Sequence, residues 1–123
     1  MYEVNRSLAL LKPRQPYLDW LTALPGIDAA RIDLSELKRG CNALLIPPAD
    51  DMDAARDFVL QRHQELFEAE LADWCEDDSL WPAERDLPTF LAWFDVEVHA
   101  ILTDLVDEAL ERESFDPFDL DLS

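Results

Sequence analysis

The chain has 123 residues, of which 49% are hydrophobic and 31% are charged, and its formal net charge is −18 at pH 7. A domain of this length buries roughly two thirds of the surface of its unfolded chain, and this supply of apolar side chains argues against wholesale disorder. The charge is uneven, because residues 1–49 hold six basic and five acidic side chains whereas residues 50–123 hold four basic and twenty-three acidic ones. Such an excess opposes direct binding to nucleic acid and to anionic membrane surfaces.

The compartment is indicated by the cysteines and by the N-terminus. Cys41 and Cys75 lack the spacing of a metal or redox motif, and the first residues lack the basic start and long apolar run of a signal peptide. The apolar stretches are far shorter than the ~20 residues that cross a bilayer. We therefore expect a cytoplasmic protein with two free thiols.

Two short apolar runs that end in proline, residues 7–13 and 42–48, predict buried strands. Between them, Pro16 stands where the first turn of a helix tolerates proline, and the apolar residues that follow predict a short amphipathic helix ending near Pro25. Residues 33–38 then predict about one helical turn before Gly40.

A single long helix is predicted over residues 51–74, with Asp50 as its N-cap. Charged and amide side chains fall on its outer surface, which should be strongly acidic. The apolar stripe expected to face the core consists of Ala55, Val59, Leu66, Phe67, Leu71 and Trp74.

After a polar turn, residues 80–82 form a compact apolar group in a charged loop, and Asp86 or its neighbour can cap a further helix through Trp93. From Phe94 the pattern alternates, with Asp95, Glu97 and His99 on one face, which favours a strand over a continuous helix.

The fold expected from these elements is a single α+β domain over residues 1–113. A small sheet of about three strands should pack against the long helix and two or more shorter helices. Residues 114–123 alternate acidic and apolar side chains, including Phe115 and Phe118. This pattern is typical of mobile docking tails, with packing as an edge strand as the alternative.

Chemistry has few candidates in this sequence. Imidazole titrates near neutral pH and binds metals. An alternative hypothesis to a binding function is therefore a metal or hydrolytic site formed by His99, Glu97 and His63. No HxH, HExxH or EF-hand pattern supports it. With two glycines in the whole chain there is no phosphate-binding loop, so we expect no cofactor.

The tryptophans indicate binding or core packing, because tryptophan is enriched at both kinds of position. Trp20, Trp74 and Trp93 fall on predicted apolar faces and are expected in the core. Trp81 lies in the charged loop, where it is either an exposed anchor for a partner or part of the core.

Several blocks resemble a group of small, uncharacterised bacterial proteins with no established activity: PYLDWL at residues 16–21, SLWP at 79–82, RDL at 85–87 and FLxWF at 90–94. The resemblance implies a bacterial cytosolic protein and transfers no catalytic residue. It suggests that residues from these blocks and the following strand meet around one cleft, in which Arg85 either pairs with Asp86 or Glu97 or receives an anion. The residues concerned are Tyr17, Asp19, Trp20, Trp81, Arg85, Asp86, Glu97 and His99. Of these, Tyr17, Trp20, Trp81, Arg85 and Asp86 are the predicted partner-binding residues, together with Phe115 and Phe118 of the tail.

Taken together, these observations favour a non-enzymatic interaction protein that binds a basic or nucleic-acid-binding protein. It would act through the acidic helix face, Trp81 and the Phe115/Phe118 tail. The alternatives are an acidic surface that serves solubility alone, and the metal or hydrolytic site at His99.

Overall fold

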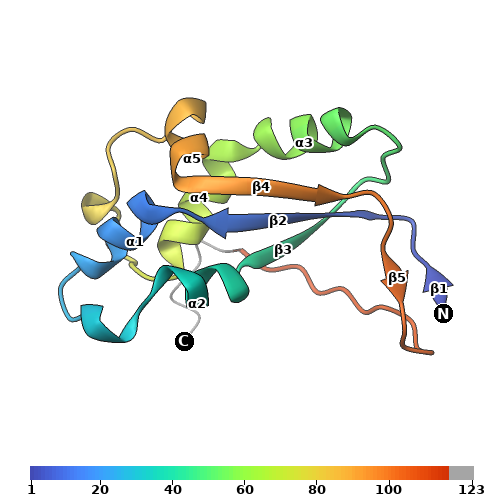
Figure 1. Cartoon of the computed structure of the whole chain (residues 1–123), viewed down its shortest axis with the longest axis horizontal. Coiled ribbons are helices and arrows are strands. Elements are labelled where there is room, and N and C mark those ends of the chain that lie inside the picture. Colours follow the sequence, from blue (N-terminus) through green and yellow to red (C-terminus); the bar gives the residue numbers. More distant parts are fainter. Residues whose placement is uncertain (117–123) are drawn as a thin grey trace.

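The computed structural model describes residues 1–116 and shows an α+β fold (Figure 1). Its strands are β1 (Tyr2–Glu3), β2 (Ser7–Pro13), β3 (Asn42–Ile46), β4 (Phe94–His99) and β5 (Thr103–Asp104). Its helices are α1 (Gln15–Thr22), α2 (Leu34–Arg39), α3 (Met52–Leu60), α4 (His63–Ala72) and α5 (Leu87–Trp93). Short 3₁₀ turns occupy Ala29–Arg31 and Asp78–Leu80. No helix among residues 1–116 is long and apolar enough to cross a membrane.

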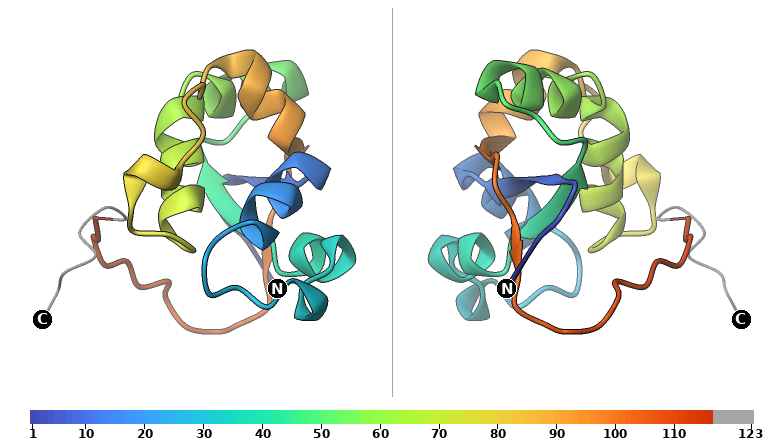
Figure 2. Two further views of the ribbon diagram at one scale, coloured as in Figure 1. Left: turned by 90° about the vertical axis from the view of Figure 1, so that its left-hand side faces the viewer. Right: turned by 90° about the vertical axis from the view of Figure 1, so that its right-hand side faces the viewer.

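The central sheet is antiparallel with the strand order β3-β2-β4. Side chains of β2 alternate strictly, with Ser7, Ala9 and Leu11 buried and the residues between them half-buried. Helices α3, α4 and α5 cover the buried face, while α2 lies against the opposite face beside Lys12 (Figure 2). The alternation predicted for residues 94–99 is confirmed, because β4 buries Phe94 and Val96 and turns Asp95 and His99 outward.

Aromatic rings fill the core between the sheet and the helices. The Phe67 ring lies 5.2 Å from that of Trp93, 5.6 Å from that of Phe94 and 6.0 Å from that of Phe90, measured between ring centroids. Tyr17 extends this cluster toward α1, with its ring 5.2 Å from Phe94. The sheet is therefore joined to three helices through one set of ring contacts.

The prediction of one continuous helix over residues 51–74 is wrong, because the chain bends at Gln61 and Arg62 between α3 and α4. Arg62 leaves the helical conformation, and its guanidinium donates to the Phe58 carbonyl and lies over the Phe58 ring. Residues 61–65 are all polar, so burial provides no force that would continue the apolar stripe through them. The N-cap is Asp51 and not Asp50, since the Asp51 side chain accepts from the Asp53 N–H at 2.9 Å.

The end of α4 also differs from the prediction. The helix stops at Ala72, and Trp74 lies beyond it with 42% of its surface exposed, so Trp74 is not a core residue. By contrast, the cap predicted at Asp86 is confirmed: its carboxylate accepts from the Thr89 N–H and the Thr89 hydroxyl at the start of α5.

The N-terminal strand β1 pairs with β5 and, with the Tyr2 hydroxyl donating to Asp107, forms a small extension beyond the central sheet. From β5 the chain runs extended back toward the helical side of the molecule (Figure 1). It ends, in the described part, near α4, where Phe115 is 81% exposed. At the sheet edge, the Arg56 guanidinium donates to the Val96 carbonyl of β4 at 3.1 Å.

Ser7 is the fully buried polar side chain of the core, and replacing it by alanine should be costly. Its hydroxyl donates to the Ala100 carbonyl and accepts from the Ala49 N–H, both at 3.0 Å. Ser7→Ala leaves both backbone groups unpaired, so we expect a loss of about 1–3 kcal/mol in the free energy of unfolding, measured by urea denaturation. The exposed Ser35→Ala is the control, expected to change stability by no more than ~0.5 kcal/mol. Equal effects of the two variants would contradict this role for Ser7.

Candidate functional site

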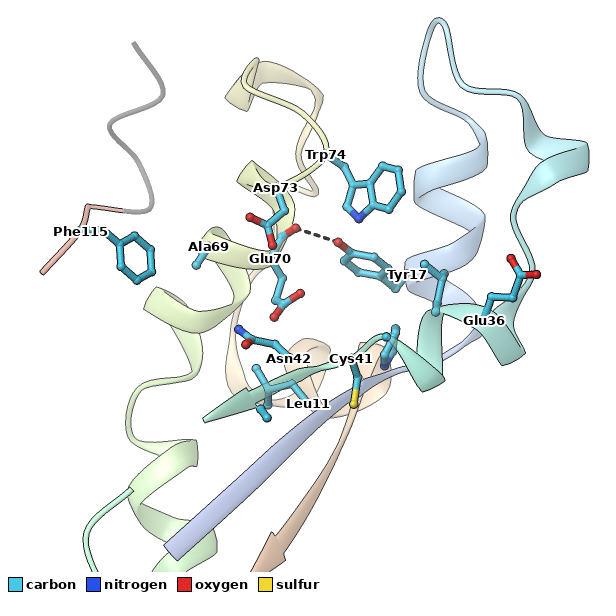
Figure 3. A pocket seen from close by; sticks show the side chains of 14 residues that line it. Leu11, Tyr17, Glu36, Cys41, Asn42, Ala69, Glu70, Asp73, Trp74 and Phe115 are labelled. Carbon is cyan, nitrogen blue, oxygen red and sulfur yellow. Dashed lines mark hydrogen bonds between the residues drawn. The ribbon is translucent and has the colours of Figure 1, made fainter. Parts of the chain in front are cut away.

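The candidate site is a pocket of about 640 Å³ between α1, α2, the start of β3 and the end of α4 (Figure 3). Tyr17 comes from α1, Glu36 from α2, Asn42 from β3, and Glu70 and Asp73 from α4 and its C-cap. Trp74 and Phe115 contribute further aromatic surface. The lining is thus a mixture of carboxyl groups and aromatic rings.

Local helix geometry explains why Glu70 enters this pocket. Residues three apart share a side of a helix, so Glu70 lies on the side of α4 that also buries Phe67, and Asp73 follows one turn later. Tyr17 is 2% exposed, and its hydroxyl donates to the Glu70 carbonyl at 2.7 Å, which fixes α1 against α4. In Figure 3 the Glu70 carboxyl group points toward Asn42.

Burial makes two carboxyl groups of this pocket, those of Glu70 and Asp73, harder to ionise. It raises the pKa of Glu70 to about 7, with a smaller contribution from the charge of Asp73, while the Asn42 side-chain amide acts in the opposite direction. Burial also raises the pKa of Asp73, and it raises the pKa of the Tyr17 hydroxyl, where Glu70 and Asp73 add to the effect. Glu70 therefore changes its charge near neutral pH.

The Glu70 Oε1 atom is buried and has no hydrogen-bond partner among the described residues. A buried acceptor without a donor costs free energy, more so when it carries charge. The side chains that line the pocket include three carboxyl groups and no Lys or Arg. The arrangement therefore favours a ligand that brings N–H donors and positive charge.

Cys41 also lines the pocket, and its environment does not activate it. Burial raises the pKa of the Cys41 thiol, although the nearby Lys12 acts in the opposite direction. A thiol with a raised pKa is a poor nucleophile at neutral pH, because the thiolate is the reactive form. Cysteine nucleophile chemistry is therefore disfavoured at this position.

Trp81 and Arg85, predicted as partner-binding residues, are engaged within the fold. Trp81 is half-buried against the core, and its indole N–H donates to the Cys75 carbonyl at 2.9 Å. The structure therefore favours the interpretation of Trp81 as part of the core over its interpretation as an exposed anchor for a partner. Arg85 donates to the Pro82 carbonyl at 2.8 Å, and its Nε lies 3.3 Å from Glu68 Oε1. That contact has the distance of an ion pair without the alignment of a hydrogen bond, so we treat it as electrostatic.

The cleft suggested by the resemblance does not form as expected. Tyr17 and Trp20 are adjacent, with ring centroids 5.5 Å apart, and the Trp20 indole N–H donates to the Leu80 carbonyl. Arg85 pairs with Glu68 and not with Asp86 or Glu97, which corrects both expected pairings. Glu97 points out of the opposite face of the sheet from the buried Phe94, away from Tyr17.

The alternative site at His99 is brought together only in part. Glu97 Oε2 lies 2.8 Å from His99 Nε2, and Glu97 Oε1 lies 3.0 Å from Lys12 Nζ. His63 is on the other side of the sheet, with its ring 6.1 Å from Phe90 and its Nδ1 2.7 Å from the Leu60 carbonyl. Within residues 1–116, no three His, Cys, Asp or Glu side chains are grouped to hold a metal ion.

Phe115 lies at the rim of the pocket, while Phe118 lies outside the described residues. Sequence reasoning did not identify Glu70 or Asp73 as site residues, and it counted Glu70 among the solvated acidic side chains of the helix. One signal was available: Glu70 is three residues from Phe67 and next to Leu71, so it falls beside the buried stripe.

Comparison with known proteins gives no further guide to the site. No family model matches the sequence, and the searches of curated proteins and of solved structures find no match.

Proposed function

We propose that the protein is a non-enzymatic interaction protein of the bacterial cytoplasm that binds a basic protein, such as one that itself binds nucleic acid. The acidic surface of α3 and α4 would face the basic surface of that partner. The C-terminal segment that contains Phe115 and Phe118 would be a second point of contact. Trp81 is not part of this proposal, because its indole packs against the core.

One observation carries the proposal: the carboxylates of α3 and α4 are almost uncompensated. Asp53, Asp57 and Glu65 are exposed and form no ion pair within residues 1–116, and Glu68 alone on these helices pairs with a cation. The two arginines nearby, Arg56 and Arg62, form no ion pair with these carboxylates, and their guanidiniums donate to backbone carbonyls.

Unpaired charge of one sign produces a field that extends beyond the surface. Such a field steers an oppositely charged partner into contact and raises the association rate, and salt screens it. It also repels phosphate-rich polymers, so a direct nucleic-acid ligand fits this surface poorly. A basic protein is the partner class that this surface favours.

Charge neutralisation on these helices should weaken partner capture. We expect a tagged protein to retain basic proteins from a bacterial lysate at low salt and to release them near 1 M salt, where the Debye length is ~3 Å. The triple variant Asp53→Asn, Asp57→Asn, Glu65→Gln should retain several-fold less of the same proteins, quantified by mass spectrometry.

A second triple variant, Glu3→Gln, Glu84→Gln, Glu108→Gln, removes the same charge from exposed positions elsewhere and should retain nearly as much as the unmodified chain. Equal loss in both variants would show a net-charge effect without a defined surface. Retention that resists high salt, or retention of no basic protein, would refute the proposal. The loss of captured protein in a 1–113 truncation measures how much the segment containing Phe115 and Phe118 contributes to partner binding.

A further inference from the structure

We propose that the pocket between α1, α2, β3 and α4 receives an arginine side chain of the basic partner, with its guanidinium between the carboxyl groups of Glu70 and Asp73 and the aromatic surface of Trp74. The inference rests on the proposed function. It adds that one arginine of the partner anchors the complex and that this pocket is the site that binds it.

The first argument is charge. Glu36, Glu70 and Asp73 line one cavity from two different helical segments, and no lining residue is cationic. Nearby Lys12 is engaged by Glu97 at 3.0 Å on the opposite face of the sheet. A cation that enters the cavity can therefore contact these carboxyl groups without breaking an ion pair that they already form.

The second argument is the unpaired acceptor at the pocket wall. Glu70 Oε1 is buried and lacks a donor among the described residues, so a ligand N–H that reaches it removes an existing cost. Charge-assisted hydrogen bonds of this kind are among the stronger ones in proteins. The gain on binding is thus larger than at an exposed carboxylate, which water already satisfies.

The third argument is Trp74. This large ring lies just past the end of α4, is 42% exposed and lines the pocket, although an indole in a small domain is normally packed inside. A cation over the face of tryptophan is stabilised by the ring quadrupole. Tyr17, by contrast, is buried and serves to position Glu70, to whose carbonyl it donates.

Arginine fits this lining better than lysine. Its guanidinium is planar, carries five N–H donors, and is weakly hydrated, so it stacks on an aromatic ring while it bonds carboxylates in its own plane. Lysine presents a compact, strongly hydrated charge that gains less from a partly desolvated site. Two carboxyl groups beside one aromatic ring match the first geometry.

Binding of a cation at this site must favour the ionised form of Glu70. The groups that face Glu70 are Asp73 of its own helix, Tyr17 of α1, and Cys41 and Asn42 at the start of β3. Glu36 of α2 contributes a further carboxylate to the same cavity. Because the pKa of Glu70 lies at about 7, affinity should rise as pH increases from 6 to 8.

The test uses the full chain and a fluorescently labelled peptide of alternating arginine and glycine at low salt. Glu70→Gln should weaken its binding about tenfold and remove the rise in affinity between pH 6 and 8, since one charge-assisted hydrogen bond is worth about that factor. Trp74→Ala should weaken binding several-fold. Glu84→Gln removes the same charge from an exposed position outside the acidic surface of α3 and α4 and outside the pocket, and it should change affinity less than about threefold.

Two further peptides test the chemistry. Citrulline in place of arginine keeps the shape and removes the charge, and it should abolish binding; lysine in place of arginine should bind several-fold more weakly. Thermal melts of each variant test whether the chain remains folded.

The outcomes separate this inference from the proposed function. Equal weakening by Glu70→Gln and Glu84→Gln would mean that binding follows net charge alone, which overturns the pocket and leaves the interaction protein standing. Equal affinity for the lysine and arginine peptides would overturn the assignment to arginine. If the unmodified chain binds no arginine peptide, the inference fails, while the lysate capture decides the proposed function separately.

Discussion

Phe67→Ala should destabilise the fold by about 3–5 kcal/mol, the range observed when a buried aromatic side chain is truncated in a well-packed core. Phe67 is fully buried, and its ring contacts the rings of Phe90, Trp93 and Phe94. Removing it leaves a cavity that three neighbouring rings border, and it removes the ring contacts through which Phe67 of α4 packs on α5 and β4. Urea denaturation followed by tryptophan fluorescence measures the change.

The matched control is Phe115→Ala, which removes the same atoms from a side chain that is 81% exposed. This variant should change the free energy of unfolding by no more than ~0.5 kcal/mol. If both phenylalanines proved equally dispensable, the core described between the sheet and helices α3 to α5 would be wrong.

Glu70→Gln should stabilise the protein at pH 8 by roughly 1–2 kcal/mol and have little effect near pH 4.5. The folded chain raises the pKa of Glu70 from the ordinary 4.5 to about 7, so the folded state holds this proton more tightly than the unfolded state does. The contribution of Glu70 to the free energy of unfolding is therefore fully present below pH 4.5 and is lost as pH rises to about 7. Glutamine keeps the shape without the ionisation.

Denaturation at pH 4.5 and at pH 8 measures this effect, with Glu65→Gln as the control, because Glu65 is an exposed glutamate of the same helix. The informative quantity is the difference between the two variants across pH, since the other carboxylates contribute equally to both. A Glu70→Gln variant that loses stability with rising pH as steeply as Glu65→Gln would show that Glu70 is not buried.

Local patterns predicted the three strands of the central sheet and the short helices, whereas the short strands β1 and β5 were not predicted. Alternation identified β4, proline-terminated apolar runs identified β2 and β3, and the cap at Asp86 identified the start of α5. Each of these signals lies within a few residues of the element that it defines, so no knowledge of the tertiary arrangement was needed.

The errors have two sources. The bend at Gln61 and Arg62 coincides with the polar run of residues 61–65, a local signal that the prediction of one continuous helix overlooked. The other errors arose where distant parts of the chain decide the outcome. The pairing of Arg85 with Glu68 joins the loop before α5 to α4, although Asp86 is its neighbour in sequence.

The candidate site was hidden for the same reason. Its residues come from α1, α2, β3 and α4, and two of its carboxyl groups, Glu36 and Asp73, are 37 positions apart in the sequence. In the sequence Glu70 is one acid among many. Its burial beside Tyr17 and Asn42, which sets its unusual proton affinity, exists only after the helices have packed on the sheet.

The contact between Arg56 and the Val96 carbonyl bears on how copies of this chain behave toward one another. An edge strand with free carbonyls is a template onto which another strand can add, and this is a common route to aggregation. At β4 one of those carbonyls already accepts from a guanidinium, and β4 also turns Asp95 and Glu97 outward. The net charge of −18 also makes copies of the chain repel one another. We therefore expect the β4 edge to resist pairing with an edge strand of another copy at high protein concentration.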